Sequence, residues 1–403
     1  MSICPTEYWL WLQCALGAGA KTDELLAYFG DPEKMYNSGS KEWRLSGLLT
    51  PKKINALKSI SPSETGGIFR ECKSKGYSII TPDSEIYPER FKQLNDMPLV
   101  LYALGDTSVL KDTVSIGVVG TRNASNYGIE TAQRLSFSLA SCGVTIVSGG
   151  ALGIDSEAHA GAMLAKGRTL AFLGCGLSYD YLKENASLRR AITKYGAVVS
   201  EFSPFQSASR TTFPIRNRLI SGVTLGTLVI EAGVKSGSLI TANYALEQGK
   251  DVFAVPGDIV RSSFDGANHL IKNGAKPVFS AMDILSEYEY LYGDLIDFTK
   301  AGIPLSQIPY VEYRKTKKAV VTEKPPVNEK PVEEKRCKEK KSELDASFSD
   351  EAKKVYSVLS ENPTHVDDIL RQTSLKMSDV LSALTELELM GEIESIEGKK
   401  YKV

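Results

Sequence analysis

Residues 115–128 read SIGVVGTRNASNYG, in which a strand-like apolar run passes directly into a glycine-bearing loop that opens a helix-like segment. Further apolar runs repeat this plan at residues 144–148, 169–173, 197–200, 226–232, 251–255 and 277–280. Apolar runs that alternate with amphipathic stretches predict βαβ units and right-handed crossovers. The sequence therefore predicts the α/β class, with a Rossmann-like, doubly wound, mostly parallel sheet over residues 81–300.

The region before this domain, residues 1–80, shows five short segments with apolar residues at three- and four-residue spacing. Such spacing predicts a small helical domain. Within it, LSGLLTPKKINAL (45–57) resembles a helix-hairpin-helix whose glycine pattern is incomplete. A structural or interaction role and a DNA contact both remain open for that stretch.

The region after the domain divides into two parts. Residues 312–346 are dense in Lys, Glu and Pro and poor in large apolar side chains, which predicts a flexible charged linker. Residues 347–403 show three helix-like segments and a hairpin-like end, the pattern of a winged helix. Its second helix pair is hardly basic, so protein interaction, weak DNA binding and sequence-specific DNA binding all remain open.

The overall composition limits the kinds of site that the chain can hold. The 403 residues carry 48 Lys and Arg against 49 Asp and Glu, so any nucleic-acid site must be a local concentration of cations. Six scattered cysteines and three histidines indicate neither a disulfide framework nor a metal site, and we expect no cofactor. No apolar run approaches the roughly 20 residues that span a bilayer, and no signal-peptide pattern begins the chain, so we expect a cytoplasmic protein without membrane contact.

In a doubly wound sheet, ligands bind beyond the carboxyl ends of the strands, so the loops after the apolar runs are the candidate site. The first loop holds Gly120, Thr121, Arg122 and Ser125 ahead of a helix. Glycine lets the backbone approach an anion, the helix N-terminus attracts it, and arginine donates two hydrogen bonds to its oxygens. This loop is therefore predicted to bind phosphate.

The second loop, GGALGID, carries Gly149 and Gly150 in a tight turn ahead of Asp155. A helix cap is a more frequent role for such an aspartate than acid catalysis. A third loop, GCGLSYDYLKEN (174–185), places Lys183 near tyrosines, which suits a groove that follows a nucleic-acid backbone and stacks bases.

Two further stretches add polar groups to the same edge. Arg216, Asn217 and Arg218 open a short helix, and each arginine could equally face an external phosphate or an internal carboxylate such as Glu231. Ser236, Gly237 and Ser238 precede another helix, where their amides and hydroxyls could bind phosphate or simply cap the helix.

Several enzyme signatures are missing from these loops. No GxGxxG with a distant acidic residue, no GxxxxGK[ST] and no GxSxG is present, so NAD binding, P-loop ATP binding and serine hydrolysis lose support. His159 is the one histidine near the loops, and a core or surface position is its expected role. The residues alone thus predict a phosphate-binding site and leave nucleotide and polynucleotide undecided.

The loops occur in one order: GVVGTRNASNYG, VSGGALGIDSEAHAGA, GCGLSYDYLKEN, FPIRNRLISG, VIEAGVKSGSLITANYALEQGKDVFAVPG and GANHLIKNGA. This collinear set resembles the DNA-processing protein A (DprA/Smf) family over the whole central domain. A helical N-terminal domain of the sterile-alpha-motif type and a C-terminal winged helix also occur in that family. The resemblance implies a homodimeric, single-stranded-DNA-binding recombination mediator that protects incoming DNA and loads RecA during natural transformation, and that is not an enzyme.

The resemblance also implies roles for particular residues. The family's glycine-[Ser/Thr]-arginine motif falls on Gly120, Thr121 and Arg122, and its lysine falls on Lys183, although YDYLKEN lacks the proline of the family's pattern. The patterns PxRNRxISG and SGSLITA begin here at residues 214 and 236. The family self-associates through the C-terminal edge of the Rossmann-like domain, which here would include Leu270 and Ile271.

Two other hypotheses compete with this interpretation. A Rossmann-fold nucleotide hydrolase of the phosphoribohydrolase type would use Glu231, but the PGGxGT signature of that group is absent. A transcription factor would instead bind duplex DNA through the winged helix.

Overall fold

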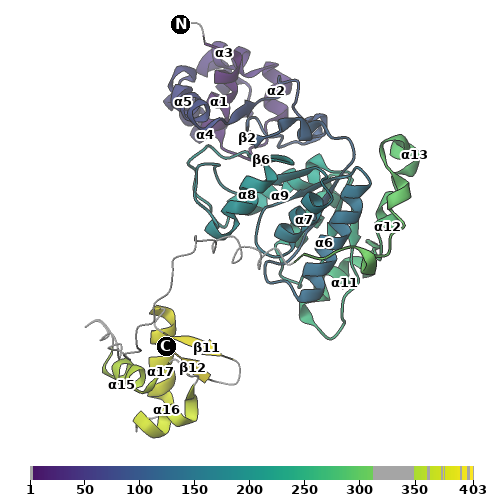
Figure 1. The fold of residues 1–403 in the computed structure, drawn as a ribbon. Coiled ribbons are helices and arrows are strands. Elements are labelled where there is room, and N and C mark those ends of the chain that lie inside the picture. The colour runs from purple at the N-terminus through teal and green to yellow at the C-terminus, as the bar shows by residue number, and fades with distance from the viewer. Residues whose placement is uncertain are drawn as a thin grey trace, which may run out of the picture. The chain divides into compact units, whose positions relative to one another are not determined.

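The computed structural model describes residues 3–311, 349–360, 364–373, 375, 377–390, 393–396 and 400–402. The chain divides into two compact units, Met1–Glu323 and Lys324–Val403 (Figure 1). The predicted linker at 312–346 lies outside the described residues. No helix in the described ranges is long and apolar enough to cross a membrane.

The first unit is built on a nine-stranded sheet with the order β1-β2-β6-β5-β4-β3-β7-β8-β9. Its strands are β1 Ser78–Ile80, β2 Leu101–Gly105, β3 Ser115–Val119, β4 Thr145–Ser148, β5 Thr169–Phe172, β6 Gly196–Ser200, β7 Gly226–Val229, β8 Asp251–Ala254 and β9 Lys276–Pro277. All neighbours from β6 to β9 pair in parallel, whereas β2 is antiparallel to β6 and β1 to β2. The predicted α/β class and mostly parallel sheet are confirmed.

The strand order reverses beside β3. The chain proceeds from β3 through β4 and β5 to β6 on one side, and then crosses back to β7 and β8 on the other. The carboxyl ends of β3 and β7 therefore border the topological switch point, where such sheets bind ligands.

Helices cover both faces of this sheet. They are α6 Asn126–Ser141, α7 Ile154–Leu164, α8 Ala186–Ile192, α9 Thr212–Val223, α10 Ser238–Glu247, α11 Asp265–Lys272 and α12 Met282–Leu285. A short helix, α13 Glu289–Tyr292, follows α12 and has no buried residue. Apolar residues of α6, α7 and α12 fill one core, and those of α9, α10 and α11 fill the other. α6 and α7 can pack closely because Gly161 has no side chain. A Cβ at this position would overlap the Gln133 carbonyl oxygen.

The N-terminal part of the unit is helical, as predicted. Its helices are α1 Pro5–Leu16, α2 Asp23–Phe29, α3 Pro32–Leu45, α4 Pro51–Ser59 and α5 Gly66–Lys75. Three of them begin at a proline, the residue favoured in a first helical turn. Trp9, Trp11 and Trp43 share one apolar core with Leu99 and Tyr102, so these helices pack directly on the edge of the sheet.

Within its described residues, the second unit has three helices and a small antiparallel sheet. Its elements are α15 Asp350–Val358, β10 Thr364–His365, α16 Val366–Thr373, α17 Met377–Met390, β11 Glu394–Ile396 and β12 Lys400–Lys402, with strand order β10-β12-β11. Val355, Ile369 and Leu384 are buried in its own core. This arrangement confirms the predicted winged helix.

Candidate nucleic-acid interface at the carboxyl edge of the sheet

A pocket of about 430 Å³ lies at the switch point, beyond the ends of β3, β4 and β7. Its walls come from four separate loops and from the first turns of α9 and α10. Lining residues include Gly120, Thr121, Arg122, Asn123, Asp155, Arg210, Phe213, Arg216, Asn217, Ser236, Gly237 and Ser238. The structure thus brings together most of the residues that the sequence placed in separate loops.

Glu231 holds the loop after β3 in place through hydrogen bonds. The backbone N–H of Thr121 donates to the Glu231 carbonyl oxygen at 2.8 Å. The Glu231 carboxylate is buried and accepts from the Ser125 N–H at 3.0 Å and its hydroxyl at 2.8 Å. Ser125 Oγ in turn accepts from the Gly128 N–H as the cap of α6. Ser125, predicted to bind phosphate, therefore caps a helix and does not line the pocket.

Arg122 stands free of that network at the surface. Its guanidinium carbon lies 4.9 Å from the centre of the Phe213 ring, a cation–π distance. Arg216 lies on the same ring at 5.9 Å, and Tyr181 contacts it at 5.4 Å between ring centres. One aromatic side chain thus orders two guanidinium groups at the pocket.

Arg216 lies deep in the pocket wall and is 5% exposed. Its Nη1 donates to the carbonyl oxygens of Gly149, at 2.6 Å, and Phe172, and its Nε donates to Asn217 at 3.0 Å. Burial lowers the pKa of the guanidinium, and the nearby Asp155 carboxylate opposes that shift. The three acceptors are neutral, so these bonds hold the cation without cancelling its charge.

Gly149 makes this placement possible. A Cβ at position 149 would overlap the Arg216 guanidinium. The sequence analysis placed this glycine in a tight turn of the candidate phosphate site. In the structure the lack of a side chain at this position leaves room for the Arg216 guanidinium.

Arg218 has a different position from the one predicted for a phosphate ligand. It is 2% exposed and its Nη2 donates to both carboxylate oxygens of Glu201, at 2.8 and 2.7 Å. Asp96 lies 3.3 Å from its Nε. The internal ion pair, one of the two alternatives left open by the sequence, is thus the one formed. Its partner is Glu201 instead of Glu231, because α9 turns this side chain toward β6 and the N-terminal helices.

The first turn of α10 completes the far wall. The hydroxyls of Ser236 and Ser238 lie 2.8 Å apart, and Asn217 Nδ2 donates to the Gly237 carbonyl at 3.3 Å. α9 and α10 both begin at the pocket, so the positive ends of two helix dipoles face the same space.

Gly149, Gly150 and Lys183, all predicted to bind phosphate, lie outside this pocket. Gly149 and Gly150 line the same smaller neighbouring cavity, and the Gly150 carbonyl accepts from Asn185 Nδ2 at 3.1 Å. The Lys183 side chain is 82% exposed, with its Nζ 3.6 Å from Asp180. Lys183 therefore belongs to the surrounding surface, and its role in DNA binding remains a prediction.

Two buried titratable groups near the pocket are structural. Burial raises the pKa of Asp155, against the influence of Arg216, and its carboxylate accepts from the Ala151 N–H at 3.3 Å. His159 is fully buried beside Thr169, and burial lowers its pKa to about 3. A histidine that stays neutral in the core matches the expected role and is not available to solvent.

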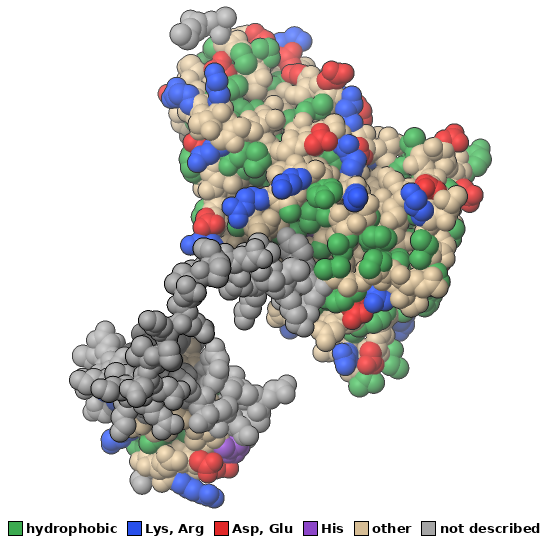
Figure 2. Space-filling model, viewed as in Figure 1, with side chains coloured by type: hydrophobic (Ala, Val, Ile, Leu, Met, Phe, Trp, Pro, Cys, Tyr) green, Lys and Arg blue, Asp and Glu red, His purple; other side chains and the backbone are tan. Residues whose placement is uncertain are grey.

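Arg210 and Phe213 line the pocket and were missed by the sequence analysis. Both lie in the stretch SRTTFPIRNR, and an arginine beside Ser and Thr just ahead of the PxRNR pattern was the available signal. Figure 2 shows Lys and Arg side chains dispersed among acidic ones over the viewed face of the molecule.

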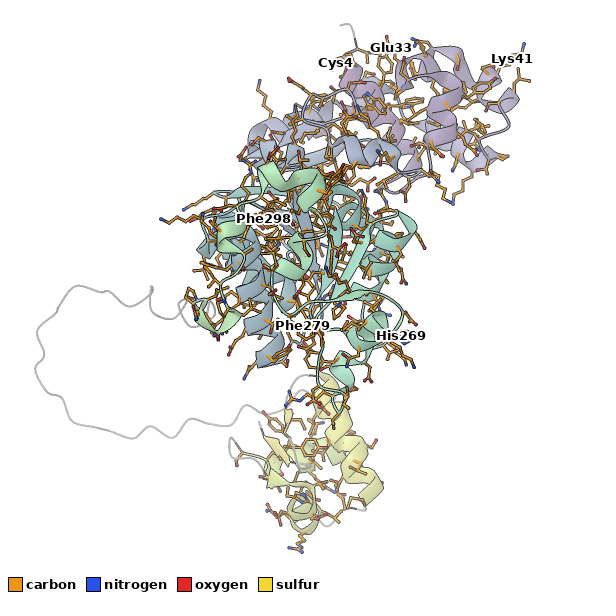
Figure 3. All side chains as sticks on the ribbon, turned by 90° about the vertical axis from the view of Figure 1, so that its right-hand side faces the viewer. Cys4, Glu33, Lys41, His269, Phe279 and Phe298 are labelled. Atoms are coloured by element: carbon orange, nitrogen blue, oxygen red, sulfur yellow. The ribbon has the colours of Figure 1, made fainter. Side chains whose placement is uncertain are left out.

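The predicted self-association residues lie elsewhere, on α11. Leu270 and Ile271 are partly buried and pack against the core. In Figure 3, His269 of the same helix lies at the edge of the domain. The interface assignment remains a proposal. No cluster of His, Cys, Asp and Glu able to hold a metal occurs among the residues that the structure describes.

Comparisons with known proteins agree with this picture. The family model described as DNA recombination-mediator protein A matches residues 78–289, and that of the DprA winged helix domain matches residues 339–399. DNA processing protein DprA of Bacillus subtilis is 41% identical over 215 residues, which are 53% of this chain and 72% of that protein. Protein Smf of Synechocystis is 32% identical over 350 residues, 83% of this chain and 82% of that one.

A solved structure is also similar. The X-ray structure of DNA processing protein A from Streptococcus pneumoniae is 32% identical, with a TM-score of 0.61, and the match covers 71% of this chain and 99% of that chain. Two family models and relatives aligned over most of their length identify the same family. The chain therefore belongs to the DNA recombination-mediator protein A family.

Proposed function

We propose that this recombination mediator binds single-stranded DNA in the pocket at the switch point and catalyses no reaction there. The observation that carries the proposal is the pair of guanidinium groups, Arg122 and Arg216, ordered on the Phe213 ring beside two helix N-termini. Cations and oriented amides of this kind bind phosphate oxygens. The phosphate of a polynucleotide backbone supplies such an anion at each nucleotide.

The same geometry supports a binding protein over a nucleotide hydrolase. Glu231, the acid that a hydrolase would use, is 1% exposed and holds Ser125 in place. His159 is enclosed in the core. The polar groups that do line the pocket are suited to holding an anion, with Asp155 as the one acid among those named above.

The partners follow from the family resemblance. We propose that the protein forms a homodimer in the cytoplasm, protects incoming DNA during natural transformation and loads RecA onto it. The Leu270 and Ile271 face of α11 is its dimer contact. Sedimentation of the full chain with Leu270→Glu tests that contact, because a charge at a buried interface disfavours association.

DNA binding is tested by fluorescence anisotropy of the full chain with a labelled single strand and the matching duplex over a range of salt. Arg122→Ala weakens single-strand binding about tenfold at low salt and lowers the salt slope by about 1, because one phosphate contact is lost. Arg44→Ala, an exposed arginine on α3, is the matched control and leaves binding unchanged. Tighter binding of the duplex, or equal binding by both variants, would contradict the proposal.

A further inference from the structure

The pocket is too small to enclose a polynucleotide. Its volume of about 430 Å³ falls in the range of small-molecule sites, roughly 300–1,000 Å³. A bound strand must therefore leave the pocket and cross one of its rims. What the rims expose decides where the strand can continue.

The loop after β7 forms one of these rims and leads to a second loop. On its inner side, Ser236 and Gly237 line the pocket. On its outer side, Gly233 packs against the backbone of residues 262–263, and the Ala232 carbonyl accepts from the Gly266 N–H at 2.8 Å. The loop between β8 and α11 is thus directly adjacent to the loop that borders the pocket, at the same carboxyl edge of the sheet.

These two loops expose apolar side chains together with cations. Ile259 and Val260 are 86% and 88% exposed, and Val234 is 69% exposed. Lys235 and Arg261 are exposed between and beside them. We call these five residues the apolar rim.

The exposure of Ile259 and Val260 is built into an ordered turn. Asp258 Oδ1 accepts from the Val260 N–H at 2.9 Å, and the Asp258 carbonyl accepts from the Arg261 N–H at 3.1 Å. The turn therefore presents two β-branched side chains to solvent, where they bury nothing of the domain itself. Arg261 pairs with Asp258 at 3.6 Å in the open, an ion pair weak enough to be exchanged for a phosphate.

We propose that the apolar rim is a second single-stranded DNA subsite, on which bases rest as the strand leaves the pocket. Single strands expose base faces that duplexes hide, and aliphatic side chains insert between bases in other nucleic-acid complexes. Lys235 and Arg261 supply cations for the adjoining phosphates. The subsite rests on the proposed function, because it continues the strand that the pocket holds.

The test uses the full chain and thymidine oligonucleotides from about 2 to about 16 nucleotides long, which covers the range of single-strand site sizes. The variant is Ile259→Ser with Val260→Ser. The matched control is Tyr290→Ser with Leu291→Ser, two side chains of α13 that are 96% and 70% exposed. Wild-type affinity increases with length, and the variant loses about tenfold for the longest strands while it binds the shortest ones normally.

Three results would overturn the subsite. They are equal binding by variant and wild type at every length, an equal loss at every length including the shortest, and a change in sedimentation with DNA binding unaltered, which would assign the rim to protein contact. A wild-type chain that binds no single strand at any length would instead refute the proposed function, so the two failures are distinguishable.

Discussion

The two arginines Arg216 and Arg218 are two residues apart on α9 and have opposite surroundings. Arg216 faces the pocket, where its hydrogen bonds go to neutral carbonyl and amide oxygens and Asp155 is the nearby carboxylate. Arg218 faces the interior, where Glu201 neutralises it. The difference teaches that one helix serves both stability and binding. The acceptors around each buried arginine determine whether that arginine stabilises the fold or serves the pocket.

The largest expected effect comes from breaking the buried ion pair between Arg218 and Glu201. Arg218→Met leaves the Glu201 carboxylate buried without its partner and lowers the free energy of unfolding by about 3–5 kcal/mol. Urea denaturation measures it. The double variant Arg218→Met with Glu201→Leu recovers most of that loss and still binds single-stranded DNA, since Arg216 is untouched. Failure of the double variant to recover would mean that the pair is not the cause.

The second largest expected effect, roughly 2 kcal/mol, is a loss of stability at acidic pH. Burial lowers the pKa of His159 from 6.5 to about 3, and the nearby Arg216 cation adds to that shift. The unfolded chain therefore binds an extra proton between those values, so stability is lost as pH falls through this window, by roughly 2 kcal/mol between about pH 6.5 and about pH 5. Urea denaturation of wild type and His159→Gln at both pH values isolates the contribution. An equal loss of stability between the two pH values in wild type and His159→Gln would contradict this role of His159.

The smallest expected effect concerns the ring that separates Arg122 from Arg216. Phe213→Leu keeps an apolar side chain but removes the cation–π contact, which is worth about 0.5–1 kcal/mol at an exposed site. We expect single-strand affinity to fall about threefold to fivefold, with an unchanged salt slope because no phosphate contact is removed. Phe213→Tyr retains the ring and is the control. A loss in Phe213→Tyr as large as that in Phe213→Leu would refute an ordering role.

Much of the sheet was predictable because its strands are continuous apolar runs. β3 occupies the predicted residues 115–119, and β4 to β8 lie within a residue or three of their predicted limits. β1 and β2 were missed. β1 has three residues and β2 follows a proline-bearing connector, so neither shows the alternation with helices that identified the others.

The site was predictable as a set of loops, but the role of each side chain was not. Loop position predicts that Arg122, Asn217 and Ser236 meet at the switch point, and they do. Whether Ser125 caps a helix or Arg218 pairs internally depends on residues such as Glu231 and Glu201, distant in sequence, that only the fold brings near. Arg210 and Phe213 lie just ahead of the PxRNR pattern and were not singled out as site residues.

The core shared by the N-terminal helices and the sheet edge has a consequence for how the molecule can be divided. Leu99, Val100 and Tyr102 are covered by the tryptophans of α1 and α3, and the Gly19 N–H donates to the same Glu201 that pairs with Arg218. Removing residues 1–77 would uncover that apolar surface and take away one donor of the buried carboxylate. The helical region therefore packs on the sheet edge as part of the same compact unit as the central domain.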